Sequence, residues 1–166
     1  MSVPVPASAA AADTAEQVYR TYRDTVLRLA YARTGNKEAA EDLLQEVFVR
    51  YIKASPAFLC EEHRKAWLLR VTINCSNSFL SSAWHRRCVP LSEEIPALSG
   101  EASDVAAAVA ALPAKYRTVI HLFYYEGYSV EEIASILHSR TGTVKSHLYR
   151  ARQILKGQLK GEYSDV

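Results

Sequence analysis

Three successive stretches of this chain, within residues 14–82, place apolar side chains at intervals of three and four residues. In the first stretch, residues 14–34, these positions are Val18, Tyr22, Val26, Leu29 and Ala30. This spacing puts the side chains on one face of an α-helix, and such a face has to be buried against another element. Three amphipathic helices joined by short turns therefore predict a compact helical domain in which each helix covers the others.

Turn signals give the ends of these helices. Gly35 follows the first helix and predicts a left-handed C-cap. The second helix is expected over residues 37–54, ended by Ser55-Pro56, and the third over 63–82. The positions expected to face the core are Ala40, Leu43, Leu44, Val47, Phe48, Tyr51 and Ile52 in the second helix, and Trp67, Leu68, Val71, Cys75 and Phe79 in the third.

The helical pattern stops over residues 88–103, where two prolines, a glycine and acidic residues indicate a flexible linker. Beyond it, helices are expected over residues 106–112, 114–125, 130–137 and 141–159. The prediction is an all-α fold of two small helical domains, residues 14–87 and 104–160. A disordered tail is expected at residues 1–13 and a short tail at 161–166.

The last two expected helices form a helix-turn-helix pattern. Ser129 and Glu132 have the spacing of a capping box at the start of the first one. A three-residue turn follows, in which His138 is expected to adopt a positive φ. Ala134 is small enough to let the two helix axes cross closely. The pattern fits DNA binding, and it also fits an ordinary helical hairpin with a solvated basic face.

Charge is unevenly distributed, although the chain as a whole carries only +2. The net charge is +3 over residues 13–87, −4 over 88–104 and +5 over 105–160. Two basic modules on either side of an acidic joint suggest a polyanionic partner. No apolar run approaches the roughly 18 residues of a membrane span, and no signal peptide is recognisable, so a cytoplasmic protein is expected.

The sequence offers little for catalysis: it has no phosphate-binding loop and no convincing pair of nucleophile and base. We therefore expect neither an enzyme nor a cofactor. One metal-binding pattern deserves a test, because Cys60 and His63 mirror His85 and Cys88 in spacing. The alternative is chance, with each Cys acting as a small apolar residue, and no metal site is predicted.

Four segments together resemble one protein family. LPAKYRTVIHLFYYEGYSVEEIASIL and TGTVKSHLYRAR resemble the C-terminal promoter-binding domain of extracytoplasmic-function (ECF) sigma factors. AAEDLLQEVFVRYIK and AWLLRVTINCSNSFLSSAWHRR resemble the N-terminal domain of that family. The resemblance covers residues 19–159 in the family's order and spacing. It implies a subunit that binds bacterial core RNA polymerase and promoter DNA and is controlled by an anti-sigma factor.

The resemblance also implies three binding surfaces. The polymerase would be bound by Asp42, Gln45 and Glu46, which share one helix face. The melted −10 strand would be bound by Asn74, Asn77, Ser78, Ser81, Arg86 and Arg87. Duplex DNA near −35 would be bound by Arg140, Thr141, Thr143, Lys145, Ser146, His147 and Arg150.

Five positions depart from the family pattern. The family usually has Asp in place of Ser78 and an Arg pair in place of Ser81-Ser82, and this loss of charge suggests weaker or unusual strand binding. His147 replaces a common Arg, and Arg140 replaces a common Ser cap, which alters the expected −35 sequence. Two alternatives therefore remain open: a stand-alone helix-turn-helix regulator, and a degenerate sigma-like protein that binds polymerase without opening promoters.

Overall fold

The computed structural model describes residues 14–85 and 103–163. Within these ranges the chain is helical throughout its regular elements and has no strand, so the all-α prediction is confirmed. The elements, in chain order, are α2 (Ala15–Thr34), α3 (Lys37–Ala54), α4 (Glu61–His85), α5 (Ser103–Ala110), α6 (Ala114–Ile120), η1 (His121–Tyr125), α7 (Val130–Leu137) and α8 (Thr141–Tyr163). The N-terminal tail expected at residues 1–13 lies outside the described residues, as does the expected linker apart from residue 103.

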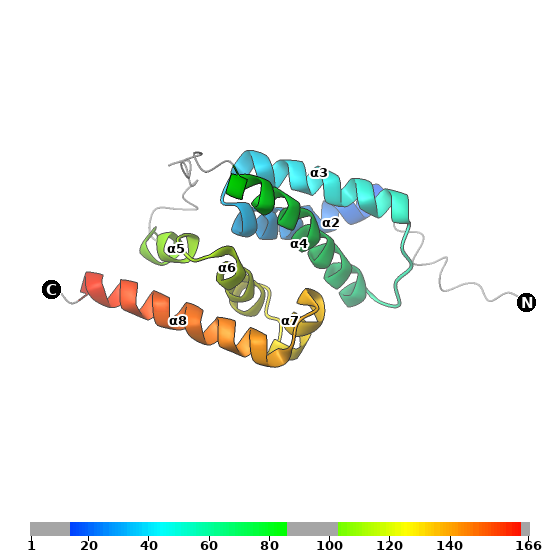
Figure 1. The fold of residues 1–166 in the computed structure, drawn as a ribbon. Coiled ribbons are helices and arrows are strands. Elements are labelled where there is room, and N and C mark those ends of the chain that lie inside the picture. The colour runs from blue at the N-terminus through cyan, green and yellow to red at the C-terminus, as the bar shows by residue number, and fades with distance from the viewer. Residues whose placement is uncertain (1–13, 86–102, 164–166) are drawn as a thin grey trace, which may run out of the picture.

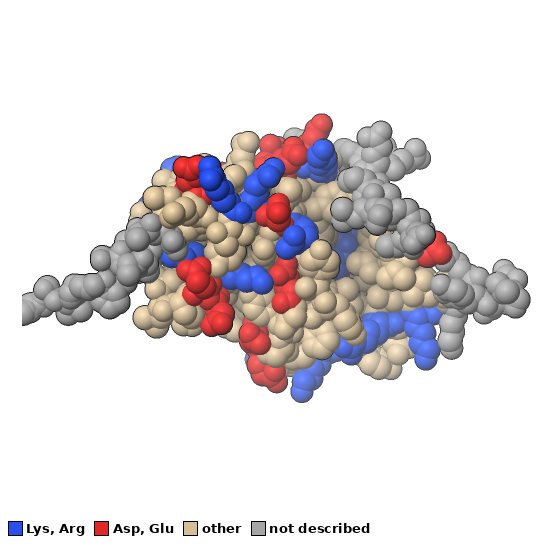
Figure 2. Space-filling view, turned by 180° about the vertical axis from the view of Figure 1, so that it is seen from behind, with Lys and Arg blue, Asp and Glu red and all other residues tan. Residues whose placement is uncertain are grey.

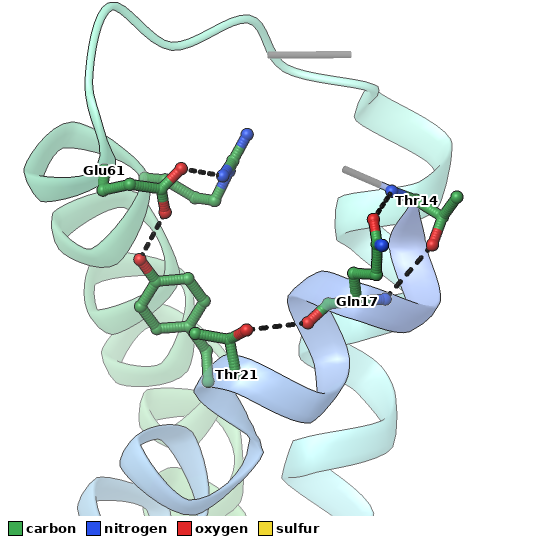
Figure 3. A network of polar contacts seen from close by, with 6 residues as sticks. Thr14, Gln17, Thr21 and Glu61 are labelled. Carbon is green, nitrogen blue, oxygen red and sulfur yellow. Dashed lines mark hydrogen bonds and ion pairs between the residues drawn. The ribbon is translucent and has the colours of Figure 1, made fainter. Parts of the chain in front are cut away.

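Local sequence signals set the ends of the first helices. Thr14 is the N-cap of α2, and it forms a capping box with Gln17 in which each side chain bonds the other residue's backbone N–H (Figure 3). Gly35 adopts φ 65°, which confirms the predicted left-handed C-cap. α4 begins at Glu61 and ends at His85, a turn or less beyond each predicted boundary.

Helices α2, α3 and α4 form the N-terminal bundle. Its core is built on Val26, Val47 and Leu68, which are fully or almost fully buried. Trp67 packs edge-on against Tyr51, with ring centroids 5.8 Å apart, as expected for a core residue. Ile52 was wrongly placed in this core, because it is 59% exposed. One residue beyond Tyr51 the helix has turned by a further 100°, which carries the side chain to the solvent.

A polar contact fixes the start of α4 against α2. The hydroxyl of Tyr22 donates to Glu61 Oε2 at 2.6 Å, and Glu61 also pairs with the buried guanidinium of Arg64 (Figure 3). Burial, followed by the bond to Glu61, raises the pKa of Tyr22 above its usual value. The phenol therefore stays protonated and remains a donor at neutral pH.

Helices α5 to α8, with η1, form the C-terminal bundle, in which α8 packs against α5, α6 and α7 (Figure 1). A single helix was predicted over residues 114–125, but the α-helical pattern ends at Ile120 and five residues of π-helix follow. The N–H of Glu126 donates to His121 O at 3.0 Å, five residues back. A π-turn adds one residue to the turn, and apolar spacing alone does not distinguish it from α-helix.

The ends of the other C-terminal helices differ slightly from the prediction. α5 covers Ser103–Ala110, so it begins three residues earlier than expected and stops two residues earlier. α7 has the predicted bounds. α8 continues to Tyr163, into the segment that was expected to be a tail. Helix ends shift easily because the terminal turn has few packing contacts.

The two bundles share a hydrophobic core. Leu29, Leu69 and Ile73 of the N-terminal bundle belong to the same buried cluster as Leu112 and Val119 of the C-terminal bundle. α4 lies against α7 and α2 against α6, so the molecule is one packed body (Figure 1). The predicted linker at residues 88–103, which would divide the chain into two domains, stays a prediction because nearly all of it lies outside the described residues.

We predict that Leu69→Ala lowers the free energy of unfolding by about 2–5 kcal/mol, because Leu69 is fully buried where the bundles meet and its loss leaves a cavity. Leu59→Ala is the matched control, since Leu59 is 93% exposed, and it is expected to stay within about 0.5 kcal/mol of the parent. Urea unfolding followed by circular dichroism measures both. Equal effects of the two changes would contradict the shared core.

Candidate partner and nucleic-acid interfaces

An acidic face lies on α3. Asp42, Gln45 and Glu46, which the sequence predicts to bind polymerase, are all exposed. Asp42 and Glu46 also line an open hollow of about 480 Å³ between α3 and α4, which Gln45 does not reach. Glu46 Oε1 forms an ion pair with Arg50 Nε at 2.9 Å, one turn along the helix. The other residues that line the hollow are Asn36, Glu38, Ala39, Leu43 and Phe79.

Val49 is a residue of this face that the sequence analysis missed. It is 42% exposed, and it follows Gln45 and Glu46 by one turn. The available signal was its position: at i+4 from Gln45 and i+3 from Glu46, an apolar residue belongs to the exposed face and not to the core stripe. The face therefore combines carboxylates with an apolar contact surface.

The polar face of α4 is continuous. Asn74, Asn77, Ser78 and Ser81 are all exposed, and their spacing of three and four residues places them on one side of the helix. Asn77 is not free there, because its Oδ1 accepts a hydrogen bond from Arg33 Nη2. Arg86 and Arg87, which were predicted to extend this surface, lie outside the described residues.

The helix-turn-helix has the predicted local geometry. Ser129 and Glu132 form the capping box, with both bonds at 3.2 Å. His138 adopts φ 52° in the turn, which confirms the expected positive φ. Ile133 of α7 and Val144 of α8 are fully buried where the two helices cross. The crossing fixes which face of α8 points outward.

The outward face of α8 carries the predicted −35 residues. Lys and Arg side chains gather along the edge of the molecule formed by α8 (Figure 2). The exposed residues of the predicted set are Arg140, Thr141, Thr143, Lys145, Ser146 and Arg150. These side chains are accessible together, which is the arrangement that a groove-binding helix requires.

His147 is the exception in that set. It is half-buried, and its ring lies edge-on against Tyr116 with centroids 5.5 Å apart. Burial, together with the nearby charges of Lys115 and Arg150, lowers the pKa of His147 below its usual value. The neutral imidazole at pH 7 makes His147 a packing residue at the edge of the DNA-facing surface, and its contact with DNA stays a prediction.

Tyr149 is the residue of α8 that the sequence analysis missed. It is 63% exposed on the outward face, one turn beyond Lys145. The available signal was its position in the helix: one residue after the buried Leu148 the helix has turned by 100°, which carries the side chain of Tyr149 away from the core. Arg152 continues the face, and its Nε donates to Tyr124 OH at 2.7 Å. An exposed aromatic ring beside basic side chains can contact sugar or thymine methyl groups.

Neither a membrane span nor a metal-binding cluster is found in the described part of the chain. No helix among the described residues is long and apolar enough to cross a membrane. In the same parts of the chain, no group of three or more His, Cys, Asp or Glu side chains is arranged to hold a metal ion. The exposed Cys60 Sγ lies 3.7 Å from Glu62 Oε2, and Cys88, which mirrors it in the sequence pattern, is outside the described residues.

Two segments match models of one protein family. Residues 18–86 match "Sigma-70 region 2", and residues 103–155 match "Sigma-70, region 4". The chain belongs to the sigma-70 family. Residues 18–86, which contain nearly all of α2 to α4, are called region 2 below, and residues 103–155, which contain α5 to α7 and most of α8, are called region 4.

Relatives of known name place this sigma factor in the ECF group. It is 31% identical over 164 residues to the ECF sigma factor SigE of Mycolicibacterium smegmatis, covering 91% of this chain and 63% of that protein. It is 29% identical over 159 residues to SigW of Bacillus subtilis, covering 84% of this chain and 85% of that one. The chain therefore spans less than two thirds of the length of SigE and most of SigW.

A solved structure has the same fold. The sigma factor RpoE from Bartonella quintana, in complex with the anti-sigma factor NepR, superposes with a TM-score of 0.74 at 26% identity. The superposition covers 87% of this chain and 96% of RpoE.

We predict that His138→Gly raises the free energy of unfolding by about 0.5–1 kcal/mol. Glycine removes the cost of roughly 1–2 kcal/mol that positive φ imposes on a residue with a side chain. The greater entropy of the unfolded chain with glycine partly offsets this gain in stability. Ser139→Gly, in the same turn but without positive φ, should be neutral or destabilising. Thermal unfolding distinguishes the two, and a loss of stability in His138→Gly would contradict the strain argument.

Proposed function

We propose that this sigma factor binds core RNA polymerase in the cytoplasm and directs initiation at its own set of promoters, without catalysing a reaction itself. The observation that carries the proposal is the presence, in one chain, of region 2 with an exposed acidic face and region 4 with an exposed basic recognition helix. A DNA-binding regulator that acts alone has no need of the exposed acidic face. A subunit of RNA polymerase uses both the acidic face and the basic recognition helix.

The polymerase would dock on the α3 face. Asp42 and Glu46 offer carboxylates to a basic partner, and Val49 beside them offers apolar area that excludes water. The hollow between α3 and α4 gives this surface a concave part that a side chain of the partner can enter. Charge steers the approach, while the apolar contacts and the hollow provide the lasting affinity.

The promoter would be bound at two places. The exposed polar face of α4 offers amide and hydroxyl groups, among them those of Asn74 and Ser78, to unstacked bases of the −10 strand. The exposed N-terminal half of α8 enters the major groove near −35, where Lys145 and Arg150 bind phosphates and Tyr149 lies against base edges. Binding energy to the melted strand then favours the open promoter.

An anti-sigma factor is proposed as the second protein partner. RpoE was solved in complex with NepR, and CnrH, a second protein of the same fold, was solved with the cytosolic domain of CnrY. The degenerate alternative, a protein that binds polymerase without opening promoters, is supported by Ser78 and Ser81 in place of the family's charged residues. Transcription assays distinguish the two.

The deciding experiment is transcription in vitro with the purified protein, bacterial core polymerase and a pool of genomic promoter fragments. New transcripts that appear only with this chain support the proposal, and their start sites give both promoter elements. Polymerase binding without transcripts would favour the degenerate protein. Direct DNA binding with no association with core polymerase would favour the stand-alone regulator.

We predict that Asp42→Ala combined with Glu46→Ala weakens the binding of core polymerase by roughly tenfold to a hundredfold, since each lost charged contact costs about 1.5–3 kcal/mol less any solvent screening. Asp24→Ala is the matched control: this carboxylate is exposed on a different helix, α2. Fluorescence anisotropy with labelled protein measures both. Unchanged binding by the double variant would overturn the docking face.

We predict different effects for Lys145→Ala and Tyr149→Ala on duplex containing the −35 element. Loss of Lys145 should weaken binding to all sequences and reduce the slope of log affinity against log salt by about 1. Loss of Tyr149 should instead reduce discrimination between the element and mutated duplex, with the salt slope kept. Arg20→Ala, an exposed charge far away on α2, serves as control. Identical profiles for the two variants would contradict these roles.

A further inference from the structure

The helix α8 has two flanks, one on each side of the face that is proposed to enter the DNA groove. Lys145 and His147 are two residues apart, so their side chains point about 200° apart around the helix axis. A helix in the major groove lies between two sugar-phosphate backbones, and each flank faces one of them. Phosphate contacts fix the position of such a helix, so a cation is useful on both flanks.

The flank at His147 has no charge at that residue. The imidazole is half-buried, and its ring lies edge-on against the buried Tyr116 of α6. Burial, and then the charges of Lys115 and Arg150, lowers the pKa of His147, so the ring is neutral at pH 7. On the opposite flank, Lys145 is exposed and carries a permanent charge. The two flanks of α8 therefore differ in what they offer to phosphate.

Lys115 of α6 brings a cation to the His147 flank from a different helix. The ring of Tyr116 connects the two side chains, because its centroid lies 5.5 Å from that of His147 and 5.1 Å from Lys115 Nζ. The charge of Lys115 is near enough to be the second cause, after burial, of the lowered pKa of His147. The ammonium group therefore lies at the edge of the same DNA-facing surface.

The Lys115 ammonium is available to an anion. The residue is exposed, and among the residues that the structure describes no carboxylate forms an ion pair with its Nζ. Its contact with the Tyr116 ring favours one position of the side chain without using up its N–H donors. Arg117, the other cation of α6, is by contrast bonded to backbone carbonyl groups. Lys115 is thus the cation of α6 that can bind a phosphate.

We propose that Lys115 binds a DNA phosphate on the His147 flank of α8, so that region 4 holds duplex DNA with a cation from α6 where α8 itself has a neutral side chain. The inference rests on the proposed function and extends its −35 surface from α8 to α6. Lys145 then anchors one flank, and Lys115 with Arg150 anchors the other. Because phosphate contacts carry no sequence information directly, Lys115 contributes to affinity and not to the choice of −35 element.

Lys115→Gln tests the phosphate contact. Glutamine removes the charge and should weaken binding to duplex DNA about threefold to tenfold at ~0.1 M salt. The slope of log affinity against log salt should fall by about 1, equally for the −35 element and for a mutated duplex. Lys115→Arg, which keeps the charge, should bind like the parent. An unchanged salt slope in folded Lys115→Gln would overturn the inference.

Arg20→Gln is the control for net charge. It also removes one exposed positive charge, but from α2 of region 2. It should leave both the affinity for duplex DNA and the salt slope at the parent values. A drop in slope equal to that of Lys115→Gln would show that only the total charge of the protein matters, and this would overturn a specific contact at Lys115.

His147→Arg gives a second test through a different helix. In the Lys115→Gln protein, a guanidinium at residue 147 stands on the same flank and should restore the salt slope. In the parent, the same change puts two cations side by side, and their repulsion should make the gain in affinity smaller. A double-mutant cycle on the four proteins measures the difference. Equal gains in the two backgrounds would overturn the inference, and a merely structural role of Lys115 predicts no rescue.

Two preparations separate this inference from the proposed function. Holoenzyme made with each variant is tested on promoter duplex, and the free full-length chain is tested on a short duplex of mixed sequence. If no protein of the series binds core polymerase, the proposed function fails and the free chain alone decides the role of Lys115. If holoenzyme forms but the slope is unchanged in Lys115→Gln, the inference fails and the proposed function stands. A parent chain that binds duplex in neither preparation would overturn both.

Discussion

Burial of the apolar faces of α2 and α4 is the constraint on which the rest of the molecule depends. Each of these helices is apolar on more than one side. One side packs inside region 2, through residues such as Val26 and Leu68, and the other packs against region 4, through Leu29 and Leu69. A helix covered on two sides holds its third side in a fixed direction. The exposed polar face of α4 is positioned in this way.

The proposed binding surfaces are consequently the helix faces that the packing leaves exposed. On α3 the face away from the core carries Asp42 and Glu46, and on α8 it carries Lys145 and Tyr149. The boundary between the regions uses a different chemistry from either surface. It combines an apolar centre with arginines bonded to neutral oxygens, so its strength depends on complete hydrogen bonding and not on opposite charge.

Much of this could be predicted from the sequence, because the signals are local. Helical periodicity and the caps at Gly35 and Ser129 gave the elements, and the positive φ of His138 followed from the length of the turn. The relative placement of the regions could not be predicted. The residues that join them, such as Arg33 and Thr118, lie 85 positions apart, and neither has a pattern that names its partner. The π-turn at η1 was missed for a related reason. An α-turn and a π-turn differ in which backbone carbonyl each N–H bonds, and the same spacing of apolar residues fits both.

The ion pair between Glu46 and Arg50 changes what the acidic face offers to a partner. Glu46 already carries its own counter-ion at 2.9 Å, so a basic group that approaches it replaces Arg50 and does not find a bare carboxylate. The association there is an ion exchange, in which one guanidinium is released for each cation bound. Added salt loosens the internal pair as well as the external one. The ionic-strength dependence of binding should thus be shallower than the number of carboxylates on the face suggests.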